Sequence, residues 1–456
     1  MTPPVTGEVV LQDPYHPYAE RFIALARAEG LRTVALYTDA EDMGRNLRKF
    51  PVLAGPDVSA SYLIEGRSWE DVAAHLRRAH HVVAVVPHGE PTVLGLGRLA
   101  ELLDLPWAQP GVLERFRDKH ALKAFLRSVP GGPRINAIAS VTGPDDVAKA
   151  VATGDFPRFV LKPNDGFGNT TIGFFDADGD PAELDQYLRE RAGTQLLMEE
   201  YIGGEEYFVD GQVDADGEVE SFAVWKYRRR DMNGRKAVSV GDIAIPTSHP
   251  DFAAIVDYTA AVMRASGLKA SPFHLELKVD EHGPCLIEVG ARLVGGELAE
   301  FDPLMHGELD MFAVALHYYL GRTEHFDSRL DWAHYDQNLL ATVNGVSYTS
   351  GLVYEIEGQA EVEARPDFVA WGQPPRIGAR LVPTVDLLRR PWRAVVRIPS
   401  EDRYDDVSAE LAATLRLNAS STGVRRAVRR GLAYRPMVAS RLERMRRPPS
   451  FVVPLP

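Results

Sequence analysis

The sequence of 456 residues is poor in cysteine and in long apolar runs. Its single Cys285 has no internal disulfide partner and cannot supply a thiolate metal cluster. Within the apolar run PCLIEV, a buried and inert thiol is expected. No run of about eighteen apolar residues occurs, and the first twenty residues lack the cationic and apolar segments of an export signal. We therefore expect a cytoplasmic protein that does not span a membrane.

Positive charge is scarce in most of the chain. The formal net charge is −13, which argues against a general nucleic-acid partner because phosphate binding needs clustered cations. Residues 418–456 are the exception, with nine arginines against the single acid Glu443. This basic tail is compatible with an acidic partner, a membrane surface or another subunit. We favour a solvated pair of amphipathic helices packed on the acidic remainder.

Two sequence patterns divide the chain. In roughly the first hundred residues, short apolar strands such as RTVALYT and HVVAVV alternate with amphipathic helices, which predicts a parallel sheet in an α/β domain. No GxGxxG follows the first strand, so this Rossmann-like domain is not expected to bind a dinucleotide. From Gly111 onward, a helix and then a series of alternating strands predict an α+β body with antiparallel sheet.

Residues 271–292 predict a hairpin that carries two carboxylates. Alternation along the strands places Glu276 on the polar face of the first strand, and Glu288 with Arg292 on the polar face of the second. Cys285, Ile287 and Val289 are expected on the apolar face. Facing carboxylates repel unless a cation lies between them, and Mg²⁺ prefers such oxygen ligands together with nucleotide phosphates. The alternative is two exposed glutamates and a structural arginine.

Residues 160–174 predict a phosphate-binding flap between two strands. Lys162 ends the first strand, and Gly166, Gly168, Asn169 and Thr170 follow. Glycines allow backbone amides to approach polyphosphate, the hydroxyl adds a donor and the lysine adds charge. The Walker pattern GxxxxGK[ST] is absent. On its own, the segment is also typical of an ordinary glycine-rich hairpin.

Residues 197–211 contain two apolar strands joined by a Gly-Gly pair. Such a hinge can offer backbone groups to the edge of adenine, with Tyr201 and Ile202 as its walls. Glu206 would then lie within reach of the ribose hydroxyls. The alternative is a surface hairpin with solvated glutamates. The basic segment 225–238 is expected to be a loop, either solvated or attracting an anion through Lys226 or Arg228.

The order of these segments resembles the ATP-grasp family over roughly residues 80–325. The helix RDKHALK precedes KPNDGFGN, then EEYIGGEE, then the ELK and IEVGAR strands. The resemblance implies ATP and Mg²⁺ as cofactors, with Mn²⁺ as the alternative metal. It implies phosphate contacts from Lys119 and Lys162, adenine contacts from Glu199, Glu200 and Ile202, a ribose contact from Glu206, a flap from Gly166, Gly168, Asn169 and Thr170, and metal ligands Glu276 and Glu288.

The resemblance also implies the architecture. We expect α/β and α+β parts: an N-terminal Rossmann-like pre-ATP-grasp domain, a glycine-rich lid subdomain and a C-terminal subdomain. The expected boundaries are 1–112 for the first domain and 113–325 for the ATP-grasp domain, with the lid at about 130–198. Residues 326–456 are expected to form the C-terminal subdomain with the basic tail.

The sequence departs from many family members at Gly290, where an asparagine commonly supplies a third metal ligand. The pattern E-x-x-A-R at this place is similar to L-amino-acid ligases of the bacilysin-synthesis type, in which the arginine stabilises the transferring carboxylate. Arg292 occupies that position. Gly296, in the following LVGG loop, would leave room for a larger first substrate.

The resemblance implies a carboxylate-amine ligase that forms an amide or peptide bond through an acyl phosphate, with catalytic roles for Arg292 and Lys162. Its substrates would be amino acids or a small natural-product acid, joined to a small-molecule amine. Independently of the resemblance, a homodimer through the first or last domain is one possible assembly. The first alternative is a biotin-carboxylase-like or purine-pathway carboxylating enzyme. The second is a nucleotide-binding protein without turnover.

Overall fold

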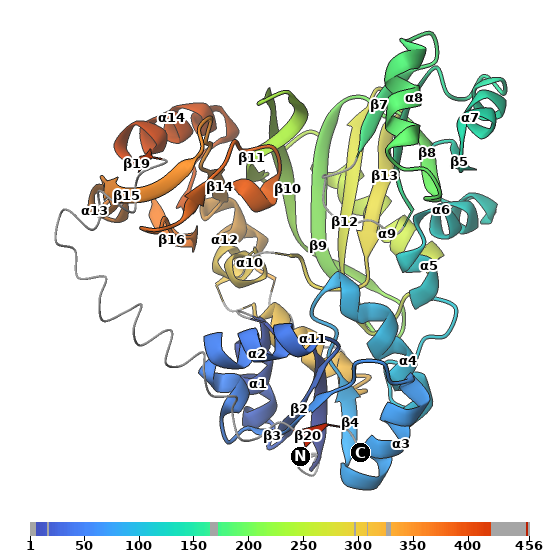
Figure 1. Cartoon of the computed structure of the whole chain (residues 1–456), viewed down its shortest axis with the longest axis vertical. Coiled ribbons are helices and arrows are strands. Elements are labelled where there is room, and N and C mark those ends of the chain that lie inside the picture. Colours follow the sequence, from blue (N-terminus) through green and yellow to red (C-terminus); the bar gives the residue numbers. More distant parts are fainter. Residues whose placement is uncertain are drawn as a thin grey trace.

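A computed structural model describes residues 6–15, 18–164, 172–295, 298–307, 309–324, 330–420 and 453–454. Figure 1 shows the N-terminal sheet at the bottom, a large central sheet above it, a small sheet at the upper right and a C-terminal lobe on the other side of the central sheet. Within the described ranges, no helix is both long and apolar enough to cross a membrane. The predicted basic tail falls mostly in residues 421–452, outside the described part.

The N-terminal region is a parallel sheet with helices on both sides (Figure 1). The strand order is β20-β3-β2-β1-β4. Strands β2 and β3 are therefore added on one side of β1, and β4 on its other side. Strand β1 reads EVVLQ and is buried over four of its five residues, as expected for a strand covered on both faces. The elements are β1 (Glu8–Gln12), α1 (Tyr18–Ala28), β2 (Arg32–Tyr37), α2 (Ala40–Lys49), β3 (Val58–Leu63), α3 (Trp69–Ala79), β4 (Val82–Val85), η2 (Glu90–Thr92), α4 (Val93–Leu103) and, at the edge, β20 (Val453–Pro454).

Local sequence explains where these helices begin. Ser68 precedes α3 and accepts a hydrogen bond from the backbone amide of Asp71, which satisfies one free donor of the first turn. Val72, Ala73 and Leu76 then recur at helical spacing and are buried. The capping serine therefore sets where α3 begins, and the apolar residues set which face of α3 is buried.

A small antiparallel sheet forms the upper right of the molecule in Figure 1. Its order is β5-β8-β6-β7, and it has an apolar cluster of its own that includes Phe159, Leu161 and Met198. Helices α5 and α6 connect it to the N-terminal region. The bounds are α5 (Leu113–Arg117), α6 (Lys119–Ser128), β5 (Ile138–Val141), α7 (Pro144–Val151), β6 (Arg158–Pro163), β7 (Gly173–Asp176), α8 (Pro181–Arg189) and β8 (Leu196–Glu200).

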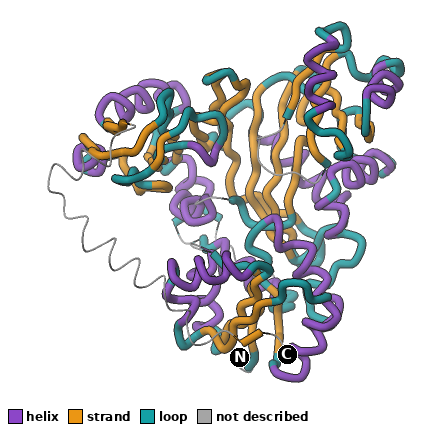
Figure 2. Tube along the Cα trace, viewed as in Figure 1, coloured by secondary structure: helices purple, strands orange, loops and turns teal. Residues whose placement is uncertain are grey.

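The central sheet has eight antiparallel strands in the order β13-β12-β9-β10-β11-β14-β18-β16. Figure 2 shows its long strands in orange above the N-terminal sheet. One cluster of buried apolar residues extends from the N-terminal sheet to this one, so the two regions share a core. The strands are β9 (Glu205–Val213), β10 (Val219–Met232), β11 (Arg235–Ala244), β12 (Ser271–Asp280), β13 (Gly283–Gly290), β14 (Leu340–Asn344), β16 (Phe368–Gln373) and β18 (Arg393–Arg397). The helices in this part of the chain are α9 (Phe252–Ser266), α10 (Leu298–His306), α11 (Met311–Tyr319) and α12 (Trp332–Gln337), of which α11 packs against α1 of the N-terminal region (Figure 1).

The C-terminal region is divided between two sheets. Strands β14, β18 and β16 continue the central sheet, whereas a separate three-stranded sheet has the order β17-β15-β19. The bounds are β15 (Gly351–Glu357), α13 (Gln359–Glu363), β17 (Arg380–Leu381), η4 (Leu387–Arg389), η5 (Glu401–Arg403), α14 (Tyr404–Thr414) and β19 (Arg416–Ser420). The domain boundaries given above remain predictions from the sequence.

The expected fold class is confirmed, with a parallel N-terminal sheet and antiparallel sheets in the rest of the described chain. The expectation of a loop at residues 225–238 is wrong, because most of this segment is the hairpin of β10 and β11. Lys226 and Arg228 both pair with Glu401 of the C-terminal lobe. These two side chains therefore attach the lobe to the sheet.

Candidate active site

The β12–β13 hairpin brings the two predicted carboxylates together. Glu276 pairs directly with Glu288 across the two strands, and His274 pairs with Gly290. The expected alternation is interrupted at one residue, since Glu276 opposes Glu288 but Leu277 opposes Leu286. The bulge puts Ile287 in the wall of a cavity beside Glu288, so its expected place on the apolar face is wrong.

A cavity of about 530 Å³ lies where the small antiparallel sheet faces the central sheet. Every predicted site residue in the described part of the chain lines it. These residues are Lys119, Lys162, Glu199, Glu200, Ile202, Glu206, Glu276, Glu288 and Arg292. The predicted flap residues Gly166, Gly168, Asn169 and Thr170, and Gly296 in the later loop, lie outside the described residues.

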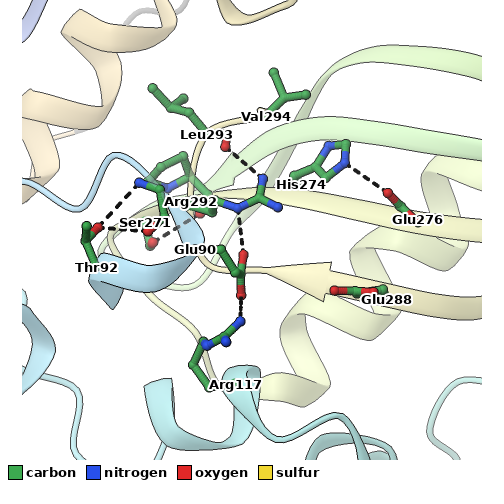
Figure 3. A network of polar contacts seen from close by, with 12 residues as sticks. Glu90, Thr92, Arg117, Ser271, His274, Glu276, Glu288, Arg292, Leu293 and Val294 are labelled. Atoms are coloured by element: carbon green, nitrogen blue, oxygen red, sulfur yellow. Dashed lines mark hydrogen bonds and ion pairs between the residues drawn. The ribbon is translucent and has the colours of Figure 1, made fainter. Parts of the chain in front are cut away.

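Glu276 and Glu288 have different surroundings. Glu276 accepts a hydrogen bond from the Tyr227 hydroxyl at 2.8 Å, and its Oε1 is 3.4 Å from His274 Nε2 (Figure 3). Burial alone would raise the pKa of Glu276, but His274, Arg229 and Tyr227 together lower it to about 2. Glu288 is more open and lies 3.3 Å from Lys119 Nζ. Glu276 is therefore held as a carboxylate, and Glu288 lies beside a lysine that can neutralise phosphate.

Glu199 sits between two buried lysines. Its Oε2 is 2.5 Å from Lys162 Nζ, and its Oε1 contacts Lys123. Lys123 also donates to the side chain of Asn136 and to the carbonyl of Leu286. Burial would raise the pKa of Glu199, but the two ammonium groups lower it to about 2. Both oxygens of Glu199 are therefore engaged by lysines, and its backbone lies in β8 between the neighbouring strands β5 and β6.

Replacing this carboxylate should destabilise the fold. Glu199→Gln leaves two buried ammonium groups without their anion, and breaking such a pair costs about 3–5 kcal/mol. We expect a melting temperature several degrees below that of the wild type. Glu190→Gln is the control, because Glu190 lies at the exposed C-terminal end of α8. It should change the free energy of unfolding by less than about 1 kcal/mol. Equal melting temperatures for the two variants would contradict the interpretation of Glu199 as the anion of this cluster.

The residues predicted to contact the nucleoside also line the cavity, and each has partners within the protein. Ile202 is buried, and its carbonyl accepts from Lys278 Nζ at 3.0 Å. The Glu200 carboxylate accepts from the amide of Ala137. Glu206 is paired with Arg229 through two contacts, 2.9 Å from Nε and 2.5 Å from Nη2. A ribose contact by Glu206 would therefore be made by a carboxylate that Arg229 already orients.

Arg292 meets a residue that the sequence did not single out. Its Nε is 2.6 Å from Glu90 Oε2, and the other oxygen of Glu90 is 2.6 Å from Arg117 Nη1 (Figure 3). Glu90 belongs to the N-terminal region, just beyond β4. Residues that follow the carboxyl ends of parallel strands commonly reach ligand sites, so the position of PHGEP after HVVAVV was the available signal.

The described residues do not form a complete metal site by themselves. Among the described residues, no group of three or more histidine, cysteine or acidic side chains is arranged around a common point. Two carboxylates on neighbouring strands of a cavity that could admit phosphates nevertheless fit Mg²⁺, which usually takes one or two protein carboxylates and completes its shell with phosphate and water. Glu276 and Glu288 are the residues that would hold it.

A buried cluster of side chains that includes two aspartates lies next to Glu276, beyond His274. His274 Nδ1 is 2.7 Å from Asp210 Oδ1, and Trp225 Nε1 donates to Asp302 Oδ1 at 2.9 Å. The second oxygens of Asp210 and Asp302 have no donor within the described structure. Burial, and then the Asp210 charge, raise the pKa of Asp302 well above its usual value. The Asp210 and Asp302 side chains interact, so we infer a proton on Asp302 that bonds to Asp210.

This proton makes stability depend on pH. Unfolded Asp302 loses its proton near pH 4, whereas the folded group keeps it to a higher pH, so its stabilising effect falls as pH rises between the two values. The amide of Asp302→Asn is uncharged at every pH, so this variant does not lose the stabilising effect. We expect the free energy of unfolding of Asp302→Asn, relative to that of the wild type, to increase from pH 6 to pH 9 by at most about 1.4 kcal/mol per pH unit. Chemical unfolding of both proteins measures the difference.

The exposed Asp178→Asn is the control for this prediction, and its difference from wild type should stay flat over the same range. A flat difference for Asp302→Asn as well would show that Asp302 is ionised in the folded protein. The Asp210–Asp302 hydrogen bond would then be wrong.

Comparisons with known proteins agree with this geometry. Residues 156–300 match the family described as an ATP-grasp domain. Dapdiamide A synthase of Enterobacter agglomerans is 29% identical over 102 residues, which are 22% of this chain and 24% of that protein. The chain therefore matches about a quarter of the length of this relative.

Solved structures cover much more of the chain. An L-amino acid ligase from Bacillus licheniformis superposes with a TM-score of 0.72 at 20% identity, over 91% of this chain and 98% of that one. The biotin carboxylase domain of 2-oxoglutarate carboxylase from Hydrogenobacter thermophilus was solved with MgADP and bicarbonate. It superposes with a TM-score of 0.63 at 16% identity, over 91% of this chain and 91% of that one. Residues 156–300 therefore match an ATP-grasp domain, and the chain as a whole has the fold of these solved structures.

Proposed function

We propose that this protein is an ATP-dependent carboxylate-amine ligase that forms an amide or peptide bond and releases ADP and phosphate. The observation that carries the proposal is a single cavity lined by Glu276, Glu288, Arg292, Lys119 and Lys162. Two anions and three cations converge there at one end of a pocket whose other end can hold a nucleoside. This is a charge pattern suited to magnesium triphosphate and a substrate carboxylate.

The nucleotide would lie along the cavity. Adenine would contact the Glu199–Ile202 segment, and the ribose would contact Glu206. Lys119 and Lys162 would neutralise the phosphates, with the predicted flap of residues 166–170 closing over them. Glu276 and Glu288 would hold Mg²⁺ or Mn²⁺, which supplies positive charge to the phosphate oxygens when bound.

The chemistry proceeds in two steps. A carboxylate oxygen of the acid attacks the γ-phosphorus, the bond to the bridging oxygen breaks, and ADP leaves with that electron pair. An amine nitrogen then attacks the carbonyl carbon of the acyl phosphate, loses a proton and expels phosphate. Arg292 holds the acid's carboxylate in the first step and the oxyanion in the second. Lys162 stabilises charge on the transferring phosphoryl group.

The nature of the acid separates this proposal from its closest rival. Similarity to an L-amino acid ligase and to dapdiamide A synthase favours amino acids or a small natural-product acid. The fold alone is also compatible with bicarbonate as the acid, as in the carboxylase domain. A cytoplasmic location, a homodimer and the absence of a nucleic-acid partner stay predictions from the sequence.

A phosphate-release screen tests the proposal. Purified protein with Mg-ATP is mixed with pairs of amino acids, with non-protein acids and amines, and with bicarbonate, and Glu288→Gln serves as the blank. We expect release that requires both an acid and an amine. Release that requires bicarbonate would favour a carboxylating enzyme, and nucleotide binding without release under any condition would favour a protein that has no turnover.

A further inference from the structure

Glu90 joins two arginines that come from different parts of the chain. It lies in η2, after the last strand of the N-terminal sheet, and its side chain is only 9% exposed. Its two oxygens are separately engaged, one by Arg292 Nε and one by Arg117 Nη1, each at 2.6 Å (Figure 3). Arg292 follows the end of β13 at Gly290, so its expected place on the second strand is wrong, and the Glu90 carboxylate fixes its guanidinium from the N-terminal region.

The charges of this cluster keep the contact in place. Burial would raise the pKa of Glu90, but the charges of Arg292 and Arg117 outweigh burial and lower it. Glu90 is therefore ionised wherever the two arginines are charged. One anion against two cations leaves a net positive charge at the end of the cavity that holds Glu288.

The absence of a side chain at Gly290 leaves room for the Glu90 carboxylate. A Cβ atom at this position would lie 2.7 Å from Glu90 Oε2, and 3.4 Å from Cγ and Cζ of Arg292. Gly290 has no left-handed backbone conformation that would by itself require glycine. The requirement is therefore steric, because any side chain there would displace the carboxylate or the guanidinium.

Two of the three guanidinium nitrogens of Arg292 are occupied. Nε donates to Glu90, and Nη1 donates to the carbonyl of Leu293 at 3.0 Å. Among the described residues, Nη2 has no hydrogen-bond acceptor, and Arg292 lines the cavity. The two contacts thus fix the plane of the guanidinium and leave one edge for a ligand.

We infer that Glu90 is a positioning residue, which holds Arg292 in place for the substrate carboxylate, and that Gly290 is required because the Glu90 carboxylate occupies the space beside it. The inference rests on the proposed function, since it assigns Arg292 to the acid. It also accounts for the missing asparagine at position 290, whose side chain would collide with Glu90.

A double-mutant cycle tests the inference. Glu90→Gln should lower kcat about 10- to 100-fold, the usual effect of losing an orienting partner, and leave the KM for ATP within about twofold. In an Arg292→Met background, the same change should lower kcat little further, because the residue it acts through is gone. Gly290→Ala should resemble Glu90→Gln. A fall in kcat of the same factor in both backgrounds would overturn the inference.

Two matched controls separate positioning from general damage. Glu101→Gln removes another carboxylate that pairs with an arginine, on the surface of α4, and should leave kcat unchanged. Gly143→Ala adds a Cβ atom where nothing lies within 4 Å and should also be silent. Loss of activity in Gly143→Ala equal to that in Gly290→Ala would remove the steric argument.

A spectroscopic measurement does not depend on turnover. The Nε–H resonance of Arg292, assigned by its loss in Arg292→Lys, should be protected from solvent exchange in the wild type and should shift or broaden in Glu90→Gln. An unchanged resonance would overturn the inference. A protected resonance in a wild-type protein that releases no phosphate would instead refute the proposed function and leave the Glu90–Arg292 contact standing.

Discussion

Glu288→Gln is expected to lower substrate-dependent phosphate release roughly 10³-fold, since removing several kcal/mol of charge stabilisation from phosphoryl transfer has an effect of that size. The amide keeps the shape of the side chain but loses its charge. Glu288 faces Glu276 and lies 3.3 Å from Lys119, so the substitution removes one of the two anions that would hold the metal. Steady-state assays over a range of Mg²⁺ concentrations measure the loss.

The control for this prediction is Glu281→Gln, at the exposed turn of the same hairpin, which should retain full activity. Glu288 is only partly buried, so the melting temperature of Glu288→Gln should stay close to that of the wild type. A large part of the lost rate should return at high Mn²⁺ or Mg²⁺. Wild-type rates in Glu288→Gln would exclude this carboxylate from the reaction.

Arg292→Met is the second change with a large expected effect. Removing one donor that stabilises developing charge costs about 10²- to 10³-fold in kcat. Because the proposed contacts of Arg292 are with the acid and not with the nucleotide, the KM for ATP should change little. Arg292→Lys should restore only part of the rate, since an ammonium cannot reproduce the planar contacts with Glu90 and Leu293.

Lys278→Met is the matched control for Arg292→Met. Lys278 also lines the cavity, but it contacts the carbonyl of Ile202 at the nucleoside end. We expect this variant to raise the KM for ATP and to leave kcat nearly unchanged. The reverse pattern, with Arg292→Met affecting only the KM for ATP, would assign Arg292 to the nucleotide and would contradict its proposed role.

The alternation of side chains along β12 and β13 was enough to place Glu276 and Glu288 on one face. It depends only on the twofold period of a strand and on the turn that joins the two strands. The same rule failed at Ile287, because a bulge adds one residue to one strand and no feature of the sequence marks its place. The consequence is an apolar side chain in the cavity next to a carboxylate.

Contacts between distant segments were out of reach of the sequence patterns. Glu90 and Arg292 are 202 residues apart, and their contact depends on how the N-terminal sheet packs against the central one. Lys123 was closer to being found, since it lies one helical turn after Lys119 in RDKHALK. Its burial against Glu199 depends on how α6 packs on β8, which cannot be predicted from the spacing of residues along the helix.

Transfer of oxygen from the acid to phosphate tests the central claim most directly. The acid is labelled with ¹⁸O in its carboxylate, turned over with unlabelled Mg-ATP and the amine, and the released phosphate is analysed by mass spectrometry. An acyl phosphate formed in this cavity predicts one ¹⁸O atom in each phosphate released. Phosphate that carries no label would mean that water attacks ATP, and the proposed ligase reaction would be wrong.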